Sequence, residues 1–420
     1  MRLHHRLPAG DRLVALILFV FLASRDVTGL SALRSLIEVL LFSAAVIELI
    51  RGVKGGSRLL INPVFLTVSL FILSVFFACA ISPLPLAGLC EMQDPVFKGI
   101  VLTPLALSIC ALGLIRRGWA ADKVALLLIV AFSFSGLGHL IWILTSYAGF
   151  FLGAGFSAKD ISFHRFKMYA VLAAFPFALT AIRCIPKRWA WLMVLVSAGL
   201  ATVTIASNSR GAWLALLISV IYFSIVHRSG INRKIVFSTL SVVGLLFSVV
   251  ALTPLSDQIG ARLSEGFNTT HRIGNGIWGA TMDMIMQNPW RGYGYGDEVY
   301  NRTYNALAAN RPGWLVLESR GAHNIILTHW VAAGVFGLGA ILALYAGFLA
   351  GTWRLIRANQ RCPVVLDLLH ACIAAFISIY LVRGQFETER WNVFGILVSI
   401  ILWLFVLREK SRSAHSTSAS

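Results

Sequence analysis

The stretch Ser319–Gly337, SRGAHNIILTHWVAAGVFG, joins a polar segment to an apolar one. His323 lies at the junction, and Asn324 follows it. The apolar window that begins here, 323–352, is long enough to cross a hydrocarbon core about 30 Å thick. We therefore expect the stretch to place His323 at the edge of a membrane, facing water.

The composition outside this stretch is that of a polytopic membrane protein: 58% of the 420 residues are hydrophobic and 13% are charged. Apolar windows of roughly 17–25 residues predict an all-α fold with about 12 transmembrane helices. The windows are 13–29, 30–50, 60–81, 96–115, 123–148, 167–185, 189–207, 211–227, 235–253, 323–352, 364–382 and 391–407.

The windows divide the chain into four parts. Residues 1–253 hold transmembrane helices 1–9, and 323–407 hold helices 10–12. Residues 254–322 form one long polar loop, which is the expected seat of chemistry. Residues 408–420 form a polar tail.

Basic residues set the orientation, because short cytoplasmic loops of membrane proteins are enriched in lysine and arginine. Alternate segments hold three each, which predicts that both termini are cytoplasmic and that the 254–322 loop is periplasmic. Set against Asp11, Asp122, Asp367 and Glu409, these 21 residues account for +17 of the net charge of +18, so no nucleic-acid partner is predicted. The inner residues are Arg2, Arg6, Arg12, Arg51, Lys54, Arg58, Arg116, Arg117, Lys123, Arg183, Lys187, Arg188, Arg228, Arg233, Lys234, Arg354, Arg357, Arg361, Arg408, Lys410 and Arg412.

Basic residues on the opposite side need another explanation. Arg165 and Lys167 begin a helix, where positive charge opposes the helix dipole, so an anion between them would be stabilising. Arg210 lies in a turn of about four residues flanked by serines and Gly211, near the depth of a lipid phosphate. Arg210 could instead be an ordinary turn residue with no ligand. Lys98 is a further basic residue on this side, and its side chain could either bind an anion or simply extend toward the membrane surface.

The polar loop contains a helical pattern and a glycine run. Residues 273–285 place apolar side chains on one face of a helix, which predicts a short helix on the membrane surface, opened by Arg272. In the following run, Tyr293 and Tyr295 alternate with three glycines. These tyrosines could form a platform for sugar rings, and a tight turn explains the same residues equally well.

At this point the residues resemble the bacterial O-antigen ligases, within the superfamily that also holds O-antigen polymerases and O-linked oligosaccharyltransferases. The family's motif of His-Asn, nine residues, Gly, two residues and Gly is complete in His323, Asn324, Gly334 and Gly337. The resemblance covers roughly residues 160–400. Further matches are Ser209-Arg210-Gly211, Arg272 before a Trp-containing helix, and the run Pro289, Gly292, Gly294 and Gly296.

The resemblance implies an enzyme of the bacterial inner membrane with a periplasmic active site. It would transfer a glycan from undecaprenyl diphosphate to a sugar hydroxyl of lipid A-core, with membrane lipid around it. His323 would be the general base, because histidine titrates near neutrality. Arginines would neutralise the diphosphate without a metal, cofactor or ATP. These are Arg210, Arg272, Arg165, Arg291 and Arg320, with support from Lys98, Lys167, Asn324, Tyr293 and Tyr295.

Several alternatives remain open. His323 could only help cap its helix while Asn324 binds the free N–H groups. A metal-dependent enzyme could use Asp297 and Glu298, or Glu387 and Glu389, although the sequence has no Asp-x-Asp element and its six cysteines lack metal-binding spacing. The glutamates after the eleventh helix more often form local ion pairs with neighbouring arginines. An O-antigen polymerase and a lipid-linked glycan transporter are the other candidate functions.

Overall fold

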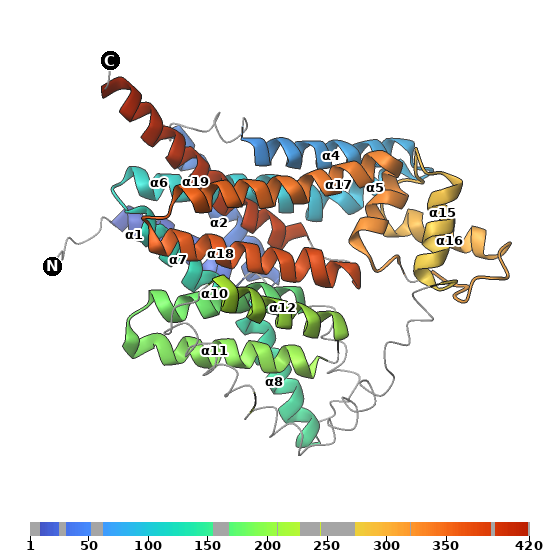
Figure 1. Ribbon diagram of the computed structural model, residues 1–420, viewed down its shortest axis with the longest axis horizontal. Coiled ribbons are helices and arrows are strands. Elements are labelled where there is room, and N and C mark those ends of the chain that lie inside the picture. The colour runs from blue at the N-terminus through green and yellow to red at the C-terminus, as the bar shows by residue number, and fades with distance from the viewer. Residues whose placement is uncertain are drawn as a thin grey trace.

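The structure is a computed structural model. It describes residues 9–24, 31–51, 62–153, 168–207, 209–226, 244, 274–319, 321–387 and 391–418, and this part of the chain is helical, without strands. The elements, shown in Figure 1, are α1 (Ala9–Ser24), α2 (Ser31–Ile50), α4 (Pro63–Ile81), α5 (Pro85–Met92), η1 (Gln93–Leu102), α6 (Thr103–Arg116), α7 (Ala121–Ser133), α8 (Leu137–Phe151), α10 (Met168–Cys184), α11 (Lys187–Ala206), α12 (Arg210–Val226), α15 (Ile277–Gln287), α16 (Asp297–Ala308), α17 (Ile325–Ala358), α18 (Pro363–Phe376), η3 (Ile377–Val382), η4 (Arg383–Gln385) and α19 (Trp391–Ser418).

Among the residues that the structure describes, six helical segments are long and apolar enough to cross a membrane, so the chain is a membrane protein. Each of them contains or overlaps one of the predicted windows. Shorter apolar helices, among them α10 and α12, account for further windows, and the window 235–253 lies, apart from Gly244, outside the described residues. The six segments are Pro63–Ile81, Pro85–Arg116, Lys187–Ala206, Ile325–Ala358, Pro363–Gln385 and Trp391–Glu409.

The prediction of one helix over 123–148 was wrong. The chain turns after Ser133 and begins α8 at Leu137, so the window contains two helices. Gly136 lies in this turn, where a Cβ would come within 3.0 Å of the Ala174 side chain and still closer to Leu200. Close packing against α10 and α11 explains the break, which apolar content alone does not reveal.

Helix starts follow local chemistry. The Asn62 side chain accepts a hydrogen bond from Val64 N at 2.8 Å, and Pro63 takes the first position of α4, where no N–H is needed. Proline also opens α5 and α18. At the other end of the chain, α19 continues to Ser418, into the stretch predicted to be a tail.

Ion pairs join loops that the charge pattern assigns to one side. Arg117 binds Asp11 at 3.1 Å and also contacts Glu48, while Arg183 binds Asp367 at 2.9 Å. In Figure 1 the start of α1, the start of α7 and the end of α19 lie at the left, and α15 and α16 lie at the right. The polar segment is therefore at the opposite end of the bundle from these loops.

The predicted helix in the polar segment is α15, and its apolar face points inward. Ile277, Met284 and Ile285 are buried, and the last two pack in a small core with Tyr300 and Tyr304 of α16. The helical spacing was thus read correctly, but the expectation that this face lies on the membrane was wrong. The face instead holds the polar segment together.

Candidate functional site

The first turn of α17 is built on Asn324. Its side chain accepts hydrogen bonds from Ile326 N and Leu327 N, both at 3.0 Å, so it is the N-cap that the sequence indicates. Its amide nitrogen donates to Gln385 at 3.2 Å, which ties the start of α17 to η4. Asn324 therefore positions the residue before it relative to η4.

His323 has a strained backbone. Its φ of 46° makes it the one non-glycine with positive φ among the residues that the structure describes. A non-glycine residue in this region costs of order 1–3 kcal/mol and persists only where its surroundings enforce it. Such strain is concentrated at functional sites, and here it sets the direction of an imidazole.

Glu387 faces that imidazole. His323 Nδ1 lies 3.3 Å from Glu387 Oε2, within ion-pair range, although the two atoms do not form a hydrogen bond. The exposed fractions of the two side chains are 24% and 11%, so water screens the pair only in part. Because the Glu387 carboxylate faces Nδ1, the other ring nitrogen of His323, Nε2, is the one that can face a substrate.

The turn that carries Glu387 also meets α12 and α15. A Cβ at Gly211 would lie 3.1 Å from the Phe386 ring, so Arg210 begins α12 directly beside this turn. The ring of Trp278, in the first turn of α15, lies 6.1 Å from that of Phe386. The segment Arg383–Glu387 is thus where Arg210, His323 and the start of α15 come together.

The sequence analysis did not predict that the segment Arg383–Glu387 would bring these residues together. It treated Glu387 as a member of a local network with neighbouring arginines and did not predict the contact with His323 that the structure shows. The available signal was a polar, charged run directly after an apolar helix, on the same predicted side as His323. Glu389 and Arg390 lie outside the described residues.

The other predicted cations are distributed as follows. Arg165, Lys167, Arg272 and Arg320 lie outside the described residues. Lys98 binds Glu38 at 2.5 Å, with Asp94 at 3.9 Å, which gives it a structural partner.

Arg291 is exposed and follows Trp290, whose carbonyl approaches Gly334. Its backbone therefore lies about 15 Å along α17 from Asn324, at a rise of about 1.5 Å per residue. Of the predicted arginines in the described part of the chain, Arg210 is the one placed beside the turn that carries Glu387.

The glycine run lies across a break in α17 and is hydrogen-bonded to it, and we call its part from Pro289 to Gly294 the strap. At Ala333 and Gly334 the backbone leaves helical geometry, so the carbonyls of Val331 and Ala332 lose their usual partners. Tyr293 N and Gly294 N donate to these carbonyls, both at 2.9 Å. The run is therefore a turn built to satisfy an interrupted helix within the apolar part of the protein.

The two tyrosines of the run have different surroundings. Tyr295 stacks on His329 at a centroid distance of 6.3 Å, in an aromatic cluster with Phe71 and Trp391. Tyr293 is half-buried, and its hydroxyl donates to Met284 O at 3.0 Å. Burial raises the pKa of Tyr293, which keeps this hydroxyl protonated.

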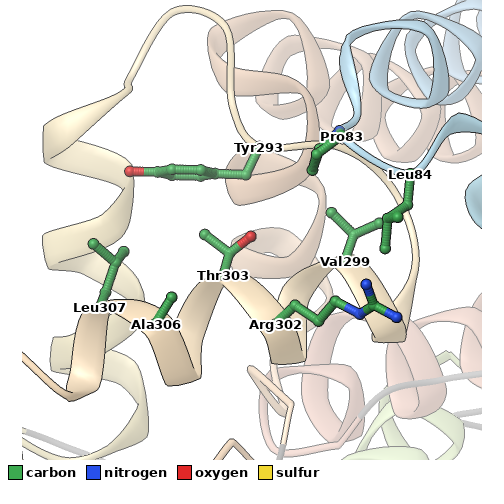
Figure 2. A pocket seen from close by; sticks show the side chains of 8 residues that line it. All are labelled: Pro83, Leu84, Tyr293, Val299, Arg302, Thr303, Ala306 and Leu307. Atoms are coloured by element: carbon green, nitrogen blue, oxygen red, sulfur yellow. The ribbon is translucent and has the colours of Figure 1, made fainter.

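Tyr293 lines a cavity of about 400 Å³ at the end of the bundle that carries α15 and α16, shown in Figure 2. Its ring lies across the cavity from α16, whose side chains form the opposite wall. The remaining lining residues come from the turn after α4. The cavity is lined by Pro83, Leu84, Tyr293, Val299, Arg302, Thr303, Ala306 and Leu307.

Comparisons with known proteins agree with the motifs. Residues 193–342, which include Arg210 and His323, match the family model described as O-Antigen ligase. The chain is also similar to the O-antigen ligase of Salmonella typhimurium strain LT2, with 28% identity over 393 residues, which cover 92% of this chain and 94% of that protein. The resemblance drawn from the histidine motif and the Ser-Arg-Gly element is therefore confirmed.

Proposed function

We propose that this protein is a glycosyltransferase of the bacterial inner membrane that moves a glycan from undecaprenyl diphosphate to a sugar hydroxyl of lipid A-core. Similarity to an O-antigen ligase over nearly the whole chain supports this reaction. The observation that carries the proposal is the His323–Glu387 pair, held at the turn beside which α12 begins with Arg210. This arrangement offers a base and a cation at one place, on the periplasmic side in the proposed orientation.

His323 acts as the general base. A sugar hydroxyl has a very high pKa, so its proton must leave as the new glycosidic bond forms. The acceptor oxygen bonds to the anomeric carbon, its proton moves to Nε2, and the bond from that carbon to the diphosphate breaks. Glu387 holds the ring through Nδ1 and stabilises the imidazolium that results. A single displacement of this kind inverts the anomeric configuration.

The diphosphate leaves as an anion, and arginines neutralise it. Guanidinium groups bind phosphate oxygens in pairs, which replaces a metal ion in this role. Arg210 is the first residue of α12, so the N-terminal helix dipole adds to its charge. Arg272, Arg165, Arg291 and Arg320 are the further candidates for the same task.

The test is transfer by the purified protein, in chelator and without ATP, from a lipid diphosphate glycan to lipid A-core. Product linked to lipid A-core supports the proposal. Elongation of the lipid-linked glycan would instead assign a polymerase, and movement of the glycan lipid across a vesicle membrane without bond formation would assign a transporter. Loss of activity in chelator would contradict the metal-free mechanism.

Replacing Arg210 by alanine is expected to lower transfer roughly 10²-fold or more, because a preorganised donor to the leaving group is lost. Arg210→Lys should recover only part of the activity, since an ammonium lacks the paired geometry. Arg311→Ala is the matched control, because Arg311 is an exposed arginine just beyond α16. Equal activity of the Arg210 and Arg311 variants would contradict a role at the diphosphate.

Replacing Glu387 by glutamine is expected to lower kcat roughly 10–150-fold with little change in KM, the equivalent of losing a charged interaction of about 1.5–3 kcal/mol. Glu387→Asp keeps the charge and should recover part of the loss. Steady-state kinetics of the two variants and the wild type make the measurement. A change in KM alone would assign Glu387 to substrate binding rather than to His323.

A further inference from the structure

The cavity of Figure 2 lies where the membrane-spanning helix α4 ends and the polar segment covers it. Pro83 and Leu84 follow Ser82, which ends α4, and the opposite wall is one face of α16. Its volume of about 400 Å³ is in the range of small-molecule sites, about 300–1,000 Å³, rather than of protein-docking surfaces. A ligand segment of modest size therefore fits it.

One wall of the cavity is a fixed aromatic ring. The Tyr293 hydroxyl is anchored on Met284 O, and its backbone N is anchored on Val331 O across the break in α17. The ring therefore presents a face to the cavity in a single orientation, as Figure 2 shows. Holding an aromatic side chain in place before binding reduces the conformational entropy that the protein loses when a ligand binds.

The facing wall supplies polar groups among apolar ones. Thr303 is half-buried, and its hydroxyl makes no hydrogen bond within the described residues, whereas Thr281 and Thr328 each bond a carbonyl four residues before them. Directly before Thr303 is Arg302, whose guanidinium binds Glu298 at 2.6 Å at the exposed rim. The cavity thus combines an aromatic face, an unused hydroxyl and a charged rim.

We propose that this cavity is a saccharide-binding subsite, in which the apolar face of a sugar ring stacks on Tyr293 while its hydroxyls bind Thr303 and Arg302. A hydrocarbon chain fits the observations less well, because it would cover the Thr303 hydroxyl without giving it a partner. The cavity also belongs to the polar segment beyond the end of α4, where a glycan is solvated and a hydrocarbon chain is not.

The position of α16 connects the subsite to His323. The cavity face carries Arg302 and Thr303, while Asn301 and Asn305, on the opposite side of the helix, bind Ser319 at 2.6 and 2.7 Å. Ser319 precedes His323 by four residues. A helix about 10–12 Å across thus separates the subsite from this segment, a span that a glycan of several rings can cross.

The inference rests on the proposed function for its ligand, which is a saccharide of either the donor glycan or the acceptor core. We would measure binding by saturation-transfer NMR on the purified full-length protein and on its His323→Ala variant. The probes are the free glycan released from the lipid carrier, the core oligosaccharide without acyl chains, and palmitate as a hydrocarbon. The saccharide that binds identifies the source.

Tyr293→Ala is expected to weaken binding of that saccharide about tenfold, the size of one lost aromatic contact. Thr303→Val keeps the shape of the side chain and should weaken binding by a smaller factor. Tyr293→Phe is the matched control, because it keeps the ring while losing the bond to Met284. His323→Ala should bind like the wild type.

The outcomes separate the two proposals. Saccharide binding that depends on the Tyr293 ring, in a protein that transfers nothing, supports the subsite and contradicts the proposed function. Normal transfer and saccharide binding in a folded Tyr293→Ala variant contradicts the subsite alone. A third outcome is that palmitate binds, that its binding depends on Tyr293, and that it excludes the saccharide. The cavity would then be a hydrocarbon site, and the inference would be overturned.

Discussion

Replacing His323 by alanine is expected to lower transfer to lipid A-core by about 10²–10⁴-fold, the usual contribution of a general base. The acceptor hydroxyl would then have to lose its proton to water while the diphosphate leaves. The effect should fall on kcat, because the imidazole takes the proton only as the new bond forms. Initial rates with the purified variant, measured at saturating donor and acceptor, make the test.

The control for this experiment must preserve the backbone at His323. Asparagine tolerates a positive φ better than most residues, so His323→Asn should keep the start of α17 while removing the base. We expect the asparagine variant to melt at the wild-type temperature and to be as inactive as the alanine variant. Activity near the wild-type level in the asparagine variant would reduce His323 to a residue that only shapes the helix start.

The agreement between the His323 motif and the structure shows what local sequence can reveal. Capping of the helix by Asn324 was one of the alternatives that the sequence offered, and Asn324 is the N-cap, because capping depends on neighbouring N–H groups alone. Apolar windows likewise predicted the long helices, since crossing a membrane is a matter of length and composition. Features with local causes were therefore predictable from residues a few positions apart.

The features that sequence reasoning missed have distant causes. Glu387 contacts His323 only because η4 packs on both α12 and α17, and no periodicity encodes that approach. The inward face of α15 has the same spacing that a membrane-surface helix would have, so its partner could not be inferred. The break in α17 occurs within an apolar window, and it depends on the Pro289–Gly294 strap for its hydrogen bonds.

This strap explains why the histidine motif contains a glycine at position 334, well beyond the histidine. Gly334 has φ 60° and ψ −150°, a region that is essentially confined to glycine. Beside it, Val335 N donates to Pro289 O at 2.9 Å. The motif therefore joins two functions in one helix, since its first residues face the proposed chemistry and Gly334 accommodates the strap.

Replacing Gly334 by alanine is expected to destabilise the protein by several kcal/mol and to abolish transfer. A Cβ at this position would lie 2.8 Å from Arg291 N and still closer to the Trp290 carbonyl, and both are backbone groups that cannot turn aside. Backbone strain of about 1–3 kcal/mol adds to overpacking of about 1–3 kcal/mol. The melting temperature of the detergent-solubilised variant and its transfer rate are the two measurements.

Gly339→Ala is the matched control, because Gly339 lies in the same helix and a Cβ there meets nothing within 4 Å. Its melting temperature and activity should stay at the wild-type values, since alanine suits a regular helix at least as well as glycine. If Gly334→Ala were as stable and active as Gly339→Ala, α17 could run straight through residue 334. The strap from Pro289 to Gly294 would then be dispensable, and the glycines of the motif would need another explanation.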